Sequence, residues 1–499
     1  MKTIISILLT AAAILCSAIV NAQSYSAKVV DAKTGEPVSF ATIQTGEHSG
    51  TITNDEGVFA LSESQVAKLQ DSIYISSMGY EKIGLMVDEN APTTIKLNQK
   101  TNELRSVLIT AENLEAEEIL ERVKANMAQN YDVSLSKHKF FFRQSDFTNM
   151  EQLDFTVKES SIPELNQGLM DEITQAASKQ EWYYRETLGD FYGNYKGFKL
   201  YIDKAAELYD KNSDVSMDGL SDKLERIFQE NVKRDSYLKI KSGIFGTKVQ
   251  LDSAKNAEST EPEPIVTVET ENTKRPSHLT QVMGRMDELY TQLFFNEDTE
   301  LDFIEKSNRY RWELDGYTFI NNEPVYVLHF TPKGKKDFKG TLYVNTDDYA
   351  IMRLDFTNVR PTNRFGLLGI KWRRNVLRGK MLFAANEAGK YRPQYFELED
   401  GEYTSVDRPL KVIEKNKNVK GRRKQNELSM DIMVAVSSLT KYEFVVFDAE
   451  SIDQGTFANA PQNIEVKAEY MSAYDPEFWS GYDILEPNAA IQSFKVIEE

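Results

Sequence analysis

The sequence predicts an α+β protein, mainly antiparallel β, in which a prealbumin-like β-sandwich precedes a larger domain with a curved antiparallel sheet packed against helices. Two observations predict this fold class. Short apolar runs separated by turn residues fill residues 25–97 and return over residues 310–446. Between them, apolar residues recur at helical spacing in residues 220–228 and 279–295. A period of two is typical of strands with one buried face, whereas a period near 3.6 is typical of helices.

The chain opens with an export signal. Lys2 provides a short basic region, residues 4–20 are apolar or small, and Val20-Asn21-Ala22 has the small residues of a cleavage site. This pattern predicts a secretory signal peptide over residues 1–22. An uncleaved anchor is the alternative, because the run nearly reaches the roughly 20 residues of a membrane span. We expect no transmembrane segment in the mature chain, and a location in the periplasm or at the outer membrane.

Cysteine content and charge narrow the class of protein. The only cysteine is Cys16, inside the predicted signal, so disulfides, thiol catalysis and cysteine metal sites are excluded from the mature chain. The four histidines are scattered without the spacing of a zinc site, and we predict no metal and no other cofactor. The formal net charge of −18 argues against nucleic acid as a partner.

Residues 23–98 form the predicted sandwich. Turns rich in Gly, Asn and Asp separate its strand-like runs, because these residues supply positive φ or local hydrogen bonds. The runs are residues 26–30, 39–45, 58–61, 71–76 and 93–97. Short strands at this spacing predict a small antiparallel β-sandwich.

Several sequence blocks in this unit resemble the carboxypeptidase-regulatory-like domain. They are Lys28-Val29-Val30-Asp31, Thr34-Gly35-Glu36-Pro37-Val38, Phe40-Ala41-Thr42-Ile43, Thr53-Asn54-Asp55-Glu56-Gly57-Val58-Phe59 and Ile75-Ser76-Ser77-Met78-Gly79-Tyr80. The resemblance implies a prealbumin-like sandwich without a peptidase centre. It also implies a structural or docking module, of the kind found at the N-terminus of exported Gram-negative envelope proteins.

The rest of the chain divides into a connector with a helix, residues 99–135, and a large α+β domain, residues 136–499. Strands predicted at residues 139–147 and 153–158 precede the two amphipathic helices. Residues 257–276 are acidic, contain proline and predict a mobile loop. This order of strands, helices and a long meander resembles the half-barrel of periplasmic lipoprotein carriers.

Short patterns that also occur in catalytic sites are present, but out of their context. Ser134 and Ser438 each begin a Ser-x-x-Lys, yet Lys33-Thr34-Gly35 precedes them, whereas it follows the serine in penicillin-recognising enzymes. The carboxylate pairs Asp347/Asp348 and Glu399/Asp400 lie beside turn residues rather than in a catalytic pattern. We therefore predict a protein that is not an enzyme. A tight cluster of ionisable side chains in a pocket would contradict this prediction.

Two basic segments stand out against the acidic background. Residues 360–380 contain seven basic residues and no acidic one, and residues 408–424 contain eight basic residues and only Glu414. The predicted contacts with an anionic surface are Lys371, Trp372, Arg373, Arg374, Arg378, Arg422, Arg423 and Lys424. Arginine suits phosphate or carboxylate, and tryptophan suits a membrane interface. The alternative is that these residues form solvated loops that blunt sheet edges.

These observations favour a non-catalytic binding or scaffolding protein of the Gram-negative cell envelope, with an anionic lipid or an envelope protein as partner. A periplasmic lipid or lipoprotein carrier, using the concave side of the sheet, is the first alternative. A glycan or peptide hydrolase is the second. An apolar cavity under the meander would favour the carrier, and a polar cleft with facing carboxylates would favour the hydrolase.

Overall fold

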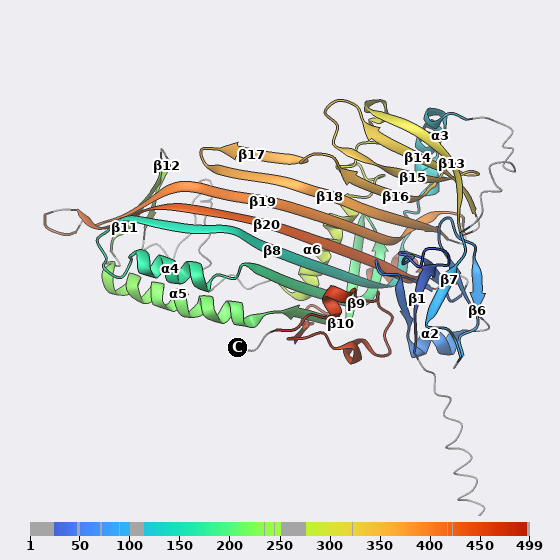
Figure 1. The fold of residues 1–499 in the computed structure, drawn as a ribbon, viewed down its shortest axis with the longest axis horizontal. Helices are drawn as coiled ribbons and strands as arrows, with labels where there is room; N and C mark the ends of the chain where they lie inside the picture. The colour runs from blue at the N-terminus through green and yellow to red at the C-terminus, as the bar shows by residue number, and fades with distance from the viewer. Residues whose placement is uncertain are drawn as a thin grey trace, which may run out of the picture.

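The computed structural model in Figure 1 describes most of the chain between residues 24 and 496. The described ranges are residues 24–46, 50–69, 72–88, 90–99, 114–233, 235–243, 245–250, 276–321, 323–386, 388–416, 418–421 and 423–496. The predicted signal peptide, the predicted acidic loop apart from Pro276, and Arg422 lie outside the described residues.

The N-terminal unit is a β-sandwich of two small sheets, as predicted. One sheet has the order β4-β1-β7 and the other β3-β2-β5-β6. Its elements are β1 (Tyr25–Asp31), β2 (Thr42–Gln44), β3 (Gly50–Ile52), β4 (Val58–Leu61), α2 (Glu63–Lys68), β5 (Ile73–Ser76), β6 (Ile83–Leu85) and β7 (Thr94–Leu97). Apolar side chains of both sheets, among them Val29, Phe59 and Ile75, are buried between them. The expectation of a purely antiparallel sandwich is wrong at one place, because β1 and β7 pair in parallel.

A 14-stranded sheet forms the large domain and spans the long axis of the molecule (Figure 1). Its main path is β13-β14-β15-β16-β18-β19-β20-β8-β9-β10-β21, with β17 paired to β18 and the β11–β12 hairpin paired to β19. The bounds are β8 (Ser136–Ser160), β9 (Gln180–Asn194), β10 (Gly197–Tyr209), β11 (Tyr237–Ser242), β12 (Phe245–Gln250), β13 (Tyr310–Ile320), β14 (Glu323–Pro332), β15 (Phe338–Asn345), β16 (Ile351–Asn358), β17 (Asn363–Leu367), β18 (Ile370–Ala385), β19 (Tyr391–Lys415), β20 (Lys424–Ser451) and β21 (Glu469–Met471).

The meander predicted from residue 310 onward is present, but the two strands predicted at residues 139–147 and 153–158 are one. Strand β8 continues through the polar residues 148–152 because its backbone pairs with β20 along the whole length. A register shift between Ala435 and Val436 of β20 absorbs one extra residue there. Polar side chains therefore do not interrupt the backbone pairing between β8 and β20.

One face of the sheet, called the inner face, is covered by helices. Helices α3 (Ala116–Asn130) and α6 (His278–Thr291) contribute Ile119, Leu120, Val282 and Met286 to its main core. Farther along, α4 (Gln167–Ala176) and α5 (Lys211–Asn231) contribute to a smaller core against β8, β19 and β20. The sequence predicted α3, α5 and α6 but not α4, which Asn166 caps by accepting from the Leu169 amide.

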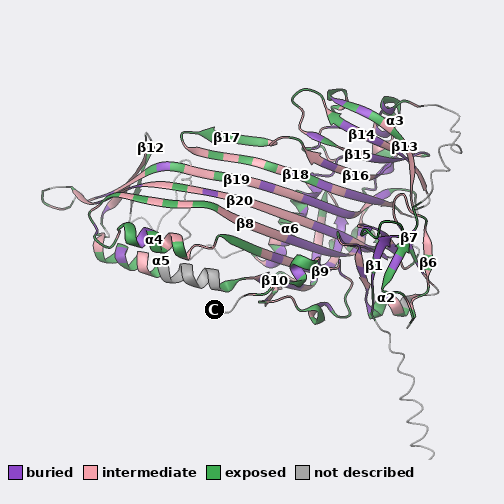
Figure 2. Cartoon of the chain, in the orientation of Figure 1, coloured by how far each residue is buried: buried purple, intermediate pink, exposed green. Residues whose placement is uncertain are grey.

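Within the described part of the chain, the opposite, outer face is covered at one end only. There Phe40 and Ile52 of the sandwich pack with Tyr395 and Val445 of the sheet. The C-terminal segment, with η3 (Pro476–Trp479) and α8 (Ala489–Gln492), closes the same core. Figure 2 shows buried residues concentrated at this end, whereas the distal parts of β8, β19 and β20 are mostly intermediate or exposed, with single buried residues such as Met430.

Candidate functional site

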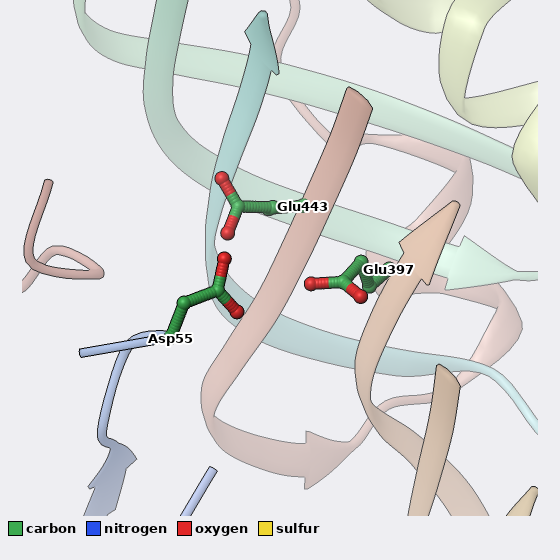
Figure 3. Close-up of side chains that lie close together, drawn as sticks. All are labelled: Asp55, Glu397 and Glu443. Carbon is green, nitrogen blue, oxygen red and sulfur yellow. The ribbon is translucent and has the colours of Figure 1, made fainter. Parts of the chain in front are cut away.

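Three carboxylates converge where the sandwich meets the outer face of the sheet. Asp55 comes from a turn of the sandwich, Glu397 from β19 and Glu443 from β20 (Figure 3). Their nearest oxygens lie within 4.8 Å of one another. The Lys441 Nζ lies 2.6 Å from Asp55, 3.1 Å from Glu397 and 3.3 Å from Glu443. The ammonium therefore supplies the positive charge that three neighbouring carboxylates require.

Local backbone geometry places Asp55. Gly57 has φ of +76°, and a Cβ there would lie 2.5 Å from the Val29 carbonyl oxygen. Only glycine fits this close approach at positive φ, so the turn predicted at residues 53–57 is held in one conformation. The Asn54 side chain accepts from the Val58 amide and donates to the Pro487 carbonyl, which joins the turn to the C-terminal segment.

Burial and the neighbouring opposite charges shift the pKa values of this cluster in opposite directions. Burial raises the pKa of Glu397, and the neighbouring Lys441 and Lys380 only partly offset it. Burial lowers the pKa of Lys441, but the carboxylates of Glu443, Glu397 and Asp55 outweigh it and leave that pKa raised. Lys441 is thus an ammonium over the whole physiological range.

A second buried ion pair continues the cluster beneath the C-terminal segment. Arg143 of β8 is 1% exposed and lies 2.7 Å from Glu186 of β9 and 3.6 Å from Glu443. Its guanidinium also donates to the Leu485 carbonyl at 2.7 Å, and the Trp479 indole donates to Glu186 at 2.7 Å. The fully hydrogen-bonded geometry offsets the cost of burying these charges.

A groove of about 690 Å³ adjoins Asp55 on the outer face. Its floor is made of two cross-strand rows of polar side chains from β14, β15, β16, β18 and β19. The rows are His329, Thr341, Asp355, Lys380 and Glu397, and Thr331, Lys339, Thr357, Arg378 and Glu399. His329 faces this groove, away from Leu328 and Phe330, as the strand period predicts.

The convergence of ionisable side chains that would contradict a non-catalytic protein is therefore present at this joint. Asp55 and Glu397 are 342 residues apart in the sequence, and no local pattern signals that they meet. Their geometry is that of a salt-bridged joint between domains, since one lysine lies against all three carboxylates. Ser438 and Lys441 lie three apart on the same strand, and so on opposite faces, which separates the residues of that Ser-x-x-Lys.

The predicted anionic-surface residues of β18 divide into two groups. Arg374 is engaged on the inner face, 2.5 Å from Asp400 and 2.8 Å from Glu300, and Arg378 lies 2.5 Å from Glu399. Trp372 donates its indole N–H to Glu402. Lys371 and Arg373 are exposed. The acidic partners come from β19 and from the segment after α6, which the composition of residues 360–380 does not reveal.

The other predicted residues lie at a separate hairpin. Arg423 is exposed, and Lys424 pairs with Glu427. Ile370 pairs with Val406 of β19, while Lys424 pairs with Lys415, nine residues farther along the same strand. At about 3.3 Å per residue the two basic regions are roughly 30 Å apart. They therefore do not form one compact patch.

The tip of the β17–β18 hairpin presents the apolar residues that are interleaved with the basic ones in residues 360–380. Phe365, Leu367 and Leu368 are 51%, 52% and 52% exposed. All five residues of β17 are exposed, and the register pairs Arg364 with Arg373 and Gly366 with Lys371, which puts these basic residues on the opposite face of the hairpin from Phe365 and Leu367. The signal is present in the sequence as an apolar turn where a polar one is usual, Leu368-Gly369 in place of Asn-Gly.

Comparison with known families identifies the N-terminal unit. Residues 25–109 match the family model of the CarboxypepD_reg-like domain, so this unit is such a domain, as the resemblance implied. No curated protein sequence matches the chain. No helix among the described residues is long and apolar enough to cross a membrane.

Three solved structures align with a large share of the chain. A domain named for outer membrane lipoprotein sorting, from Vibrio parahaemolyticus, has 11% identity, covers 69% of this chain and 97% of its own, and has a TM-score of 0.20. A LolA superfamily protein from Nitrosomonas europaea has 12% identity, the same coverages and a TM-score of 0.16. The MucA/MucB complex of Pseudomonas aeruginosa has 8% identity, coverages of 68% and 100%, and a TM-score of 0.16. Likenesses at these TM-scores carry no argument about function.

Proposed function

We propose that this protein is a non-catalytic binding protein of the Gram-negative cell envelope that docks on an anionic lipid surface through the β17–β18 hairpin. The observation that carries the proposal is Leu368, a 52% exposed apolar residue with φ of +48° at the hairpin tip. A left-handed conformation costs a leucine roughly 1–2 kcal/mol. Neither folding nor solubility favours leucine at this position, whereas insertion into a lipid interface does.

The surroundings of Leu368 fit the same role. Phe365 and Leu367 present further apolar surface beside it, and fully burying side chains of this size contributes about 1.5–3 kcal/mol each. Arg364, Lys371 and Arg373 are placed to contact headgroup phosphates, at roughly 1 kcal/mol per basic residue near an anionic membrane. The signal peptide predicted at residues 1–22 supports a location on the outer side of the inner membrane.

The test is co-sedimentation with vesicles of phosphatidylglycerol and phosphatidylcholine. Leu368→Asn is the decisive variant, because asparagine accepts positive φ and so keeps or raises stability while it removes the apolar tip. We expect it to bind vesicles at least fivefold more weakly than the wild type. Arg364→Gln with Arg373→Gln removes charge, and we expect the loss to appear only with the anionic lipid and at low salt.

Binding of Leu368→Asn equal to that of the wild type would contradict the proposal, as would equal binding to vesicles of phosphatidylcholine alone. Arg374 is not a suitable target, because its engagement with Asp400 and Glu300 makes it structural. The pair Arg423→Gln and Lys424→Gln decides whether the distal hairpin adds a second contact.

A lipid or lipoprotein carrier is a second candidate, and one observation favours it. On the inner face, a cross-strand row of apolar side chains lies between the α6 core and the α4–α5 core. The row is Leu367, Ile370, Val406, Val434 and Leu153. All five are intermediate or exposed rather than buried. Native mass spectrometry of the purified protein tests this candidate, which predicts a co-purifying acyl lipid that Val434→Asp displaces.

A further inference from the structure

A second apolar row crosses the outer face of the sheet, at the border of the region that the N-terminal domain covers. Strand register aligns Trp182 of β9 with Phe147 of β8, Phe147 with Leu439 of β20, and Leu439 with Gly401 of β19. Gly401 pairs in turn with Val376 of β18. Five strands at about 4.8 Å spacing make this outer strip roughly 19 Å long.

Aromatic side chains dominate one end of the outer strip. The ring centroids of Trp182 and Phe147 lie 4.3 Å apart, and Tyr184 stacks on Trp182 at 6.0 Å. Trp182 is 43% exposed, whereas Trp312 and Trp479 are buried and Trp372 is intermediate. The Trp182 indole therefore presents part of its surface to solvent, next to the Phe147 ring.

Gly401 lets the neighbouring apolar side chains close over the backbone of the outer strip. A Cβ at Gly401 would lie 2.9 Å from the Val376 Cβ and 3.2 Å from the Leu439 Cδ1. Because no side chain rises there, the apolar flanks of Val376 and Leu439 meet over the backbone and form a shallow floor. Such a floor suits a flat ligand lying across the strands rather than a bulky side chain entering a pocket.

Hydrogen-bonding side chains flank the outer strip. On its distal side Gln180 donates to Asn149 at 3.4 Å, and Ser437 donates to Glu151. Each amide offers both donors and acceptors. On its proximal side the charges are balanced, since Lys441 lies against Asp55 and Arg378 against Glu399. Glu151 adds an exposed carboxylate on the distal side, which disfavours an anion. The surroundings therefore match an uncharged ligand with many hydroxyl or amide groups.

We propose that the outer strip binds an uncharged oligosaccharide of N-acetylated amino sugars. The apolar face of each pyranose ring would lie on Trp182, Phe147 and Leu439, where the electron-rich ring faces attract polarised C–H groups. The acetamido and hydroxyl groups would exchange hydrogen bonds with Asn149 and Gln180. The aromatic end of this site, on β8 and β9, lies on other strands than the basic hairpin, whereas its Val376 end is on β18, three residues from Arg373. The proposed ligand needs no positive charge.

The probe is chitohexaose, and the readouts are isothermal titration calorimetry and tryptophan fluorescence on the full mature chain. We expect saturable binding by the wild type, at least tenfold weaker binding by Trp182→Ala, and weaker binding by Asn149→Ala. Trp182 is partly exposed, so its replacement leaves the fold intact, which circular dichroism checks. Trp372→Phe is the matched control, and we expect it to bind chitohexaose as the wild type does.

Three outcomes would overturn the proposal. The first is no saturable binding of chitohexaose to the wild type. The second is equal binding by Trp182→Ala and the wild type. The third is equal affinity for cellohexaose, which lacks the acetamido groups. Vesicle binding separates this site from the lipid-docking hairpin, because Trp182→Ala should leave it unchanged while Leu368→Asn should leave chitohexaose binding unchanged.

Discussion

Two ion pairs that join the long strands β8 and β20, one near each end, have opposite environments. At the proximal end, Arg143 and Glu443 are almost fully buried between the sheet, the N-terminal domain and the C-terminal segment. At the distal end, Lys158 of β8 pairs with Asp431 of β20, and both are about half exposed. The same kind of ion pair on the same two strands is therefore a structural joint in one place and a solvated contact in the other.

The contribution of an ion pair to the stability of this protein therefore depends on how far the pair is buried. A buried ion pair costs desolvation, and removing one partner leaves an uncompensated charge in a dry site. An exposed pair is screened by water and contributes little. The comparison makes three predictions about stability, which begin with the largest effect.

Arg143→Met should be the most destabilising of these changes. It leaves Glu186 and Glu443 without their guanidinium in a buried site, and we expect a loss of about 3–5 kcal/mol in the free energy of unfolding. Urea denaturation followed by circular dichroism measures it. A loss below about 1 kcal/mol would mean that water reaches these carboxylates and that the joint is not dry.

Glu397→Gln should change how stability depends on pH. The folded pKa of Glu397 is raised by burial, so the carboxyl favours the folded state most at pH below its unfolded pKa. That contribution is lost as pH rises through the folded pKa. We therefore expect the wild type to lose stability relative to the glutamine variant between acidic and neutral pH, in denaturation curves measured across that range. A constant difference between the two proteins would contradict the raised pKa.

Lys158→Ala should have the smallest effect. The lysine and Asp431 are 54% and 46% exposed, and pairs of this kind contribute about 0.2–1 kcal/mol. We expect a change within about 0.5 kcal/mol that disappears at high salt. A loss as large as that of Arg143→Met would show that the distal sheet is covered in solution, and the contrast between the two ends would fail.

Parts of the fold could be predicted from local pattern, and the candidate sites largely could not. Strands with one buried face, such as β14 to β16, repeat their apolar residues at a period of two, and the turns at Gly334 and Asp347 separate them. The break predicted inside β8 was wrong, because pairing with β20 holds polar residues in the ladder. The composition of the segment pointed to Lys371 and Arg373 of the hairpin. It pointed equally to Arg374, because the ion pairs of Arg374 with Asp400 and Glu300 are visible only in the folded structure.

Residues that are close along the chain were sufficient to predict the N-terminal domain, the antiparallel class of the large sheet and the helices α3 and α6. Tertiary structure decided which charges are buried, since the Asp55 cluster and the outer strip join residues from distant strands. Cross-strand neighbours such as Trp182 and Phe147 depend on register, which the pairing of whole strands sets. The side chains that a sheet presents to a ligand form cross-strand rows, and these rows exist only once the strands have paired.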